Sequence, residues 1–132
     1  MRELTQVPRT LRWFNLWLTL GWLLVALVIY LSLTPHPIEI DMEQGDKLGH
    51  MLGYMAMMVW FAQLYSRRMH VWWGLGFVAM GVALEYVQGW TGYRTFDYFD
   101  MLADAVGVLA GWRLGGTAMA HQLNRLERRI KA

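Results

Sequence analysis

The chain has 132 residues, of which 56% are hydrophobic and 17% charged, with twelve Lys and Arg against ten Asp and Glu. That charged fraction is below the roughly 25% that is usual for soluble domains, and the length indicates one domain. The absence of cysteine excludes disulfides and thiolate zinc sites.

The first long apolar segment runs from Trp13 to Leu33 without a charged residue. At ~1.5 Å per residue it is long enough to cross a hydrocarbon core of ~30 Å. A signal peptide is the alternative, but the run is too long for its apolar region and no small-residue cleavage site follows it. We therefore predict a first transmembrane helix over residues 13–33, followed by an acidic, proline-containing loop from Thr34 to Gly45.

Two further apolar segments predict helices over residues 47–65 and 71–88. Asp46 can cap the first of them, and glycines recur every fourth residue at its start, a spacing that lets another helix approach closely. A short basic connection separates the two segments. Trp72 and Trp73 open the second one, as expected of aromatic residues at a membrane interface.

The segment from Arg94 to Gly111 carries the most informative pattern in the chain. A fourth helix is predicted over residues 97–113, and its acidic and glycine residues follow spacings of three, four, three and four: Asp97, Asp100, Asp104, Gly107 and Gly111. Those steps place all five on one helix face. The glycine half predicts close packing against a neighbouring helix, so the acidic half points at that neighbour or into a cavity beside it.

The remaining residues, 114–132, form a basic tail. Leu123, Leu126 and Ile130 share one face if the tail is helical. We predict an amphipathic helix that lies along the membrane surface and binds anionic lipids. Because membrane anchoring accounts for the basic residues, no nucleic-acid partner is expected.

The distribution of charge predicts the orientation. Ten of the twelve Lys and Arg lie in the N-terminal lead, the connection between the second and third helices, and the tail, whereas eight of the ten acids lie at the opposite helix ends. The positive-inside rule then places both termini in the cytoplasm. We predict an all-α integral membrane four-helix bundle, one domain over residues 1–132, multi-pass in a bacterial-type inner membrane. A soluble helical bundle is the alternative, and it leaves the charge asymmetry unexplained.

This topology brings polar residues from three helices to the outer leaflet. Asp104 precedes Arg113 by nine residues, so it lies ~14 Å from the cytoplasmic interface if Arg113 reaches that interface. A carboxylate at that depth costs roughly 2.5–3.5 kcal/mol and is expected to face the bundle interior. The predicted ligand-binding pocket contains Asp46, Lys47, His50, Tyr54, Glu85, Gln88, Arg94, Asp97, Asp100 and Asp104.

The predicted pocket is strongly acidic. Its five carboxylates exceed its two cations, Lys47 and Arg94, by three. Three uncompensated carboxylates do not stay ionised together in a low dielectric. The excess negative charge can be compensated in three ways. Some carboxylates are protonated, or His50 becomes imidazolium, or the site binds a divalent cation such as Mg²⁺ or Ca²⁺. The candidate metal ligands are Asp97, Asp100, Asp104 and His50.

These residues resemble the pattern of the VanZ-like family over about residues 34–112. The resemblance implies a small multi-helix membrane protein of the cell envelope, since the family's namesake is associated with low-level resistance to the glycopeptide teicoplanin. The family usually has Asn where this chain has Asp104, and the added negative charge favours a bound cation or proton here. The matching motifs are Asp46-Lys47-x-x-His50 with Tyr54 on the next turn, Glu85-x-x-Gln88, and Arg94 followed by Asp97, Asp100 and Asp104-x-x-Gly107.

Three interpretations of the cluster stay open. It is a structural ion-pair network between helix ends, a binding pocket for an envelope lipid, cell-wall precursor or glycopeptide-like ligand, or a catalytic site. For catalysis the candidates are His50 and Asp100, with His50 as a general base or a metal ligand. No Ser or Cys nucleophile accompanies them, so a membrane hydrolase or transferase here is metal-assisted or uses water directly. The other histidines, His36, His70 and His121, are expected at the interface in contact with solvent.

Overall fold

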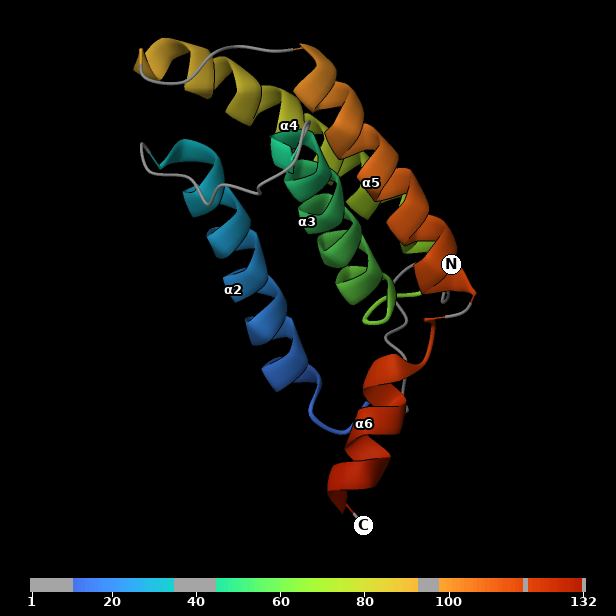
Figure 1. The fold of residues 1–132 in the computed structure, drawn as a ribbon. Helices are drawn as coiled ribbons and strands as arrows, with labels where there is room; N and C mark the ends of the chain where they lie inside the picture. Colours follow the sequence, from blue (N-terminus) through green and yellow to red (C-terminus); the bar gives the residue numbers. More distant parts are fainter. Residues whose placement is uncertain (1–10, 35–44, 93–97, 118, 132) are drawn as a thin grey trace.

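The computed structural model describes residues 11–34, 45–92, 98–117 and 119–131, excluding the side chains of residues 45–47 and 131. Within these ranges the chain is helical and has no strand, which confirms the predicted all-α class. Figure 1 shows the elements, which are α2 (Phe14–Leu33), α3 (Gly45–Ala62), the 3-10 turn η1 (Arg67–Met69), α4 (His70–Thr91), α5 (Tyr98–Gly116) and α6 (Gln122–Lys131).

The second predicted helix ends three residues early, at Ala62 rather than at residue 65. The ring Nε2 of His70 hydrogen-bonds the carbonyl of Ala62 at 2.8 Å and that of Tyr65 at 3.2 Å. The Ala62 carbonyl is one that the end of a helix leaves without an intrahelical partner, and Tyr65 lies in the connection that follows the helix. His70 is therefore buried, with 3% of its surface exposed, and the prediction that it contacts solvent was wrong.

Helix α4 continues past the predicted end at residue 88 to Thr91. Gly92 follows with a φ of +81°, the left-handed conformation in which helices commonly end and which glycine adopts without steric cost. Gly89 and Trp90, which lie beyond the predicted helix, are thus part of its last turn.

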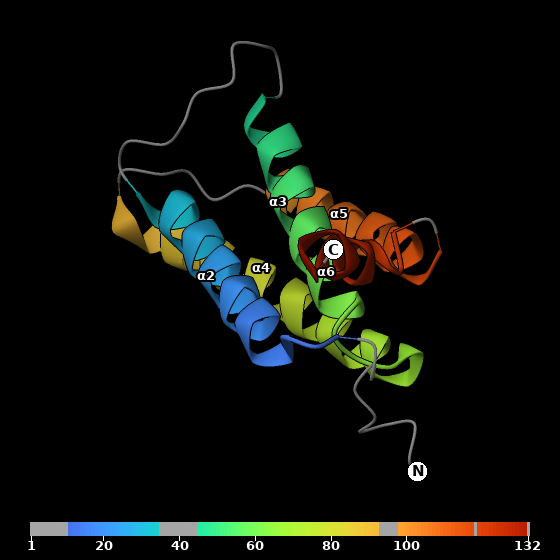
Figure 2. The same ribbon diagram turned by 90° about the horizontal axis from the view of Figure 1, so that it is seen from below.

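The closest helix pair is α3 and α5, which lie side by side in Figures 1 and 2. A methyl group added at Gly111 would lie 2.6 Å from the carbonyl oxygen of Met55, and one at Gly107 would overlap the carbonyl of Met51. The two glycines of the predicted helix face, Gly107 and Gly111, therefore let the backbone of α5 contact the backbone of α3. This contact fixes the position of the acidic half of the same face.

Helix α2 packs on α3 through small and aromatic residues. Gly21 leaves room for the rings of Trp60 and Phe61, and the indole of Trp60 donates a hydrogen bond to the Trp17 carbonyl at 2.8 Å. Phe61 also stacks on Trp73 of α4, with ring centroids 4.5 Å apart. The apolar core thus lies where α2, α3 and α4 meet.

Helix α6 extends from one end of the bundle and is held there by polar contacts (Figure 1). Glu127 accepts hydrogen bonds from the backbone N–H groups of Arg12 and Trp13, at 2.7 and 2.8 Å, and from the indole of Trp17 at 2.6 Å. Gln63 accepts one from the backbone N–H of Leu123 at 2.9 Å. Two helix N-termini are therefore capped by side chains distant in sequence.

The position of α6 differs from the predicted surface helix. Leu123 is buried against the bundle, while Leu126 and Ile130 are exposed. Figure 2, seen from below, looks nearly along the axis of α6, so the helix runs along the length of the bundle rather than across its end.

Two helical segments, Phe14–Leu33 and Arg67–Thr91, are long and apolar enough to cross a bilayer, and Leu48–Ala62 is a shorter apolar helix. A signal sequence or the core helix of a soluble protein can meet the same criterion of length and composition. In an 18-residue apolar window of each long segment only 22% and 28% of the residues are buried, however, whereas a core helix is mostly buried.

Candidate functional site

Six of the predicted pocket residues have described side chains, and they come from three helices. His50 and Tyr54 lie on α3, Glu85 and Gln88 on α4, and Asp100 and Asp104 on α5. Five are buried, with 6% of Asp100 and at most 2% of the others exposed, and His50 is partly buried. Arg94 and Asp97, and the side chains of Asp46 and Lys47, lie outside the described part of the chain.

The centre of the cluster is a side-chain pair between α3 and α5. Nδ1 of His50 lies 2.9 Å from Oδ1 of Asp104, a hydrogen-bonding distance. Glycines make this approach feasible on both sides of Asp104. Gly107, one turn further along α5, admits the backbone of α3, and a methyl group at Gly81 of α4 would lie 2.8 Å from Oδ2 of Asp104. The carboxylate of Asp104 therefore lies between α3, α4 and α5.

Other acids lie within electrostatic range of the pair. Asp100 and Glu85 act on the His50 ring along with Asp104, and Glu85 and Asp104 act on the Tyr54 hydroxyl. The predicted convergence of α3, α4 and α5 is thus seen for these five residues. Three carboxylates surround one imidazole, so the described part of the cluster is acidic.

Gln88 also contacts a helix outside the cluster, α2. Its side-chain NH₂ donates a hydrogen bond to the carbonyl of Ser32, in the last turn of α2. That carbonyl is among those that a helix end leaves without an intrahelical partner. Gln88 therefore joins α4 to α2, a structural contact that the motif Glu85-x-x-Gln88 does not reveal.

The His50–Asp104 geometry defines which ring atom is available for chemistry. A carboxylate can only accept a hydrogen bond, so with Asp104 ionised Nδ1 of His50 carries the proton. In the neutral imidazole Nε2 then holds a lone pair, which is the arrangement of a general base or a metal-binding imidazole, whereas in the imidazolium Nε2 is a second donor.

The predicted metal site is not assembled by the described residues. Among them, no group of three or more His, Asp or Glu side chains has metal-binding geometry. His50, Asp100 and Asp104 therefore do not form a complete ligand set, and Asp97, the fourth candidate, lies outside the described part. A divalent cation here would need at least one ligand from another part of the chain or from a substrate.

Sequence reasoning missed the polar contacts at the other end of the bundle, which involve Gln63, His70 and Glu127. One signal could have found Glu127, since it is the single acid in the tail after Arg113. A lone carboxylate among cations, on the same helix face as Leu123, indicates a specific partner better than it indicates a lipid-facing position.

Comparison with protein-family models, with curated proteins and with solved structures found no match. The resemblance to the VanZ-like family therefore rests on the motif residues alone.

Proposed function

We propose that this chain is a multi-pass protein of the bacterial inner membrane, with α2 to α5 as four spans and both termini in the cytoplasm. The apolar surfaces support this placement. Large hydrophobic side chains are exposed along α2, α4 and α5, among them Leu23, Leu75 and Leu109. Exposed apolar surface of this extent is rare on soluble monomers and is expected where helices face lipid.

In this placement the cluster around His50 and Asp104 is a binding site that opens to the outside. We propose that it binds an envelope lipid, a cell-wall precursor or a glycopeptide-like ligand. The observation that carries the proposal is the buried His50–Asp104 pair with Glu85 and Asp100 beside it. Burying several carboxylates between apolar helices is costly, and polar groups at such depth commonly mark ligand or ion pathways.

The charge of the cluster narrows the ligand chemistry. A bare phosphate would be repelled by the carboxylates unless a divalent cation accompanied it. Hydroxyl and amine groups, such as those of sugars and amino acids, can donate hydrogen bonds to carboxylates. The site therefore suits the sugar or peptide portion of an envelope precursor or glycopeptide. With the VanZ-like motifs, this supports a link to teicoplanin resistance.

A matched pair of histidine substitutions tests the binding proposal. His50→Gln removes the ring at the cluster, whereas His70→Gln removes a ring that caps α3 elsewhere. We expect His50→Gln to reduce binding of fluorescent teicoplanin or of a lipid-linked cell-wall precursor by about tenfold in nanodiscs, the loss of one charge-assisted hydrogen bond. His70→Gln should leave binding unchanged while lowering thermal stability.

Two results would contradict the proposal. If His50→Gln lowers stability and neither ligand binds the unaltered protein, the cluster is a structural network. If both variants weaken binding equally, the effect arises from folding. Teicoplanin susceptibility of a host that expresses each variant gives the corresponding measurement in cells.

A second function, a membrane hydrolase or transferase, is favoured by one observation. Asp104 holds Nδ1 of His50 and leaves Nε2 available, which is the orientation of a general base that activates water. The test is product release from a labelled lipid-linked precursor. Asp104→Leu, which removes the partner of Nδ1, should then reduce turnover more than it reduces binding.

A further inference from the structure

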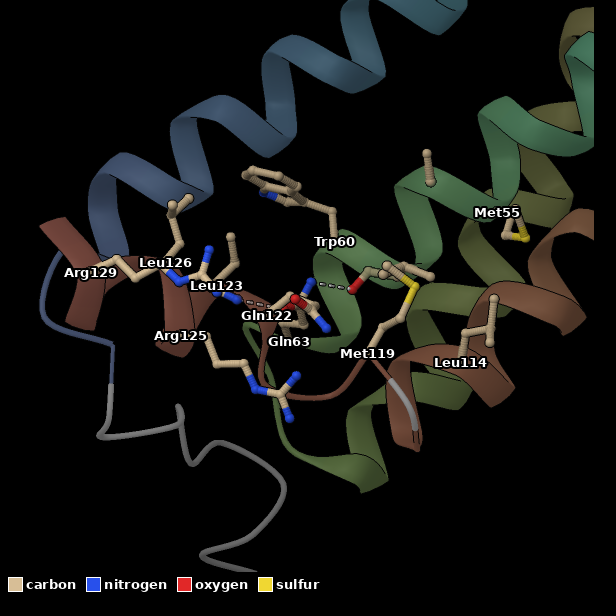
Figure 3. Close-up of a pocket in the computed structure, with 12 residues that line it drawn as sticks. Met55, Trp60, Gln63, Leu114, Met119, Gln122, Leu123, Arg125, Leu126 and Arg129 are labelled. Atoms are coloured by element: carbon tan, nitrogen blue, oxygen red, sulfur yellow. Dashed lines mark hydrogen bonds between the residues drawn. The ribbon is translucent and has the colours of Figure 1, made fainter.

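A separate pocket of about 580 Å³ lies at the cytoplasmic end of the bundle, away from His50 and Asp104. It is formed by α3, the end of α5 and α6 (Figure 3), and its volume is within the usual range for ligand sites. Most of the lining is apolar, including Met55, Trp60 and Leu114. Arg125 and Arg129 of α6 complete it.

The lining of the pocket changes along its length. Figure 3 shows the apolar Met55 and Leu114 at one end, and Arg129 beside the apolar Leu126 at the other. Met55 precedes the end of α3 at Ala62 by seven residues, so it lies ~10 Å further into the bundle along the helix axis. The pocket therefore suits an elongated molecule with an apolar portion that points inwards and an anionic group at α6.

The two arginines are placed to bind that anionic group. Arg125 and Arg129 are one helical turn apart and are exposed. Glu127, between them in sequence, hydrogen-bonds the N-terminus of α2 and Trp17 instead. In the described part of the chain neither arginine forms an ion pair. Guanidinium groups bind phosphate oxygens in pairs, with two parallel hydrogen bonds.

We propose that this pocket binds one anionic phospholipid of the cytoplasmic leaflet. The phosphate contacts Arg125 and Arg129, and an acyl chain lies against Trp60 and Met55 on α3. The inference rests on the proposed membrane placement, but it does not depend on ligand binding at His50. The proposed site differs from the general attraction of a basic helix to an anionic membrane, because Arg125 and Arg129 line a pocket whose other residues are mostly apolar.

Native mass spectrometry of the full chain in nanodiscs of equal phosphatidylglycerol and phosphatidylcholine tests the proposal. The unaltered protein should retain a single phosphatidylglycerol in preference to phosphatidylcholine. Replacing both arginines, R125Q with R129Q, should reduce that preference by about tenfold or more, since the phosphate loses two partners for charge-assisted hydrogen bonds. The matched control R128Q removes one exposed charge of the same helix that does not line the pocket, and it should change the preference by less than about twofold.

A second pair of variants tests the apolar portion of the site. Ala56→Trp fills the pocket wall and should abolish retention of the lipid with both arginines intact. Ala83→Trp, on an exposed part of α4, should not abolish retention of the lipid.

Unchanged preference in R125Q with R129Q would overturn the proposal, as would an equal loss in R128Q. Displacement of the lipid by glycerol 3-phosphate would also overturn the proposal. This compound lacks acyl chains, so binding would then not depend on the apolar part of the pocket. Failure of the protein to enter nanodiscs would instead refute the membrane placement.

Discussion

The buried polar residues at the two ends of the bundle differ in what they bind. At the end of the bundle next to α6, Glu127, Gln63 and His70 each bond backbone groups at a helix terminus. At the other end, His50 and Asp104 bond each other, side chain to side chain. Polar residues that cap helices are explained by folding alone, because a buried helix end needs partners. Helix capping does not account for the bond between the partly buried His50 and the buried Asp104, and the variants below test the proposed ligand binding against a purely structural role of this pair.

The largest effect should come from Gly107, because it lets α3 and α5 approach closely enough for His50 to meet Asp104. In Gly107→Ala the new methyl group overlaps the carbonyl of Met51, so α3 and α5 must separate. We expect a loss of ~3 kcal/mol in unfolding free energy, together with loss of binding at His50. Unfolding in mixed micelles measures the change in unfolding free energy, and the nanodisc assay measures binding at His50.

Gly76→Ala is the matched control for Gly107→Ala. A methyl group at Gly76 meets nothing within 4 Å, so the change should be neutral or stabilising by up to ~1 kcal/mol through helix propensity. Equal destabilisation by both substitutions would show that the close approach of α5 to α3 is not what holds the site together.

The next effect concerns the end of the bundle next to α6. Glu127→Ala leaves the indole of Trp17 and two backbone N–H groups without their acceptor. We expect ~2 kcal/mol lower stability, the magnitude of a lost helix cap, with ligand binding at His50 retained. Arg128→Ala on the exposed face of α6 should change stability by less than ~0.5 kcal/mol. Loss of binding in Glu127→Ala without loss of stability would show that the two ends are coupled and not separate.

Glu127 should also make the stability of the protein depend on pH. Burial favours its protonated form, but the hydrogen bonds from Trp13, Arg12 and Trp17 outweigh burial, so the pKa of Glu127 lies below its ordinary value of 4.5. A depressed pKa contributes stability that is present above the ordinary value and is lost as the pH falls through the folded-state value. Thermal unfolding between pH 6 and about pH 3 should show this loss in the unaltered protein. A parallel loss in Glu127→Gln would assign it to other carboxylates.

The sequence was informative about the cluster around His50 and Asp104 because helical periodicity is a local property. The spacing of Asp100, Asp104 and Gly107 placed them on one face without knowledge of the partner helix. The roles of Glu127 and Gln88 could not be predicted in that way. Glu127 meets Trp13 across 114 residues of sequence, and that contact depends on where α6 docks. Capping from a distant element has no periodic signature, so only the packed structure reveals it.

The smallest change in stability should come from Asp104→Asn, and it distinguishes the interpretations most sharply. The Asn side-chain oxygen can still accept the His50 Nδ1 proton, so we expect less than ~1 kcal/mol change in unfolding free energy. Asp104→Leu removes the acceptor and should cost ~1–3 kcal/mol of unfolding free energy.

If the VanZ-like resemblance reflects function, Asp104→Asn keeps ligand binding, because Asn is usual at that position in the family. If it is stable but loses binding, the negative charge itself is required. The ligand must then be cationic or accompanied by a cation, which added Mg²⁺ or Ca²⁺ would reveal in the unaltered protein and not in the variant.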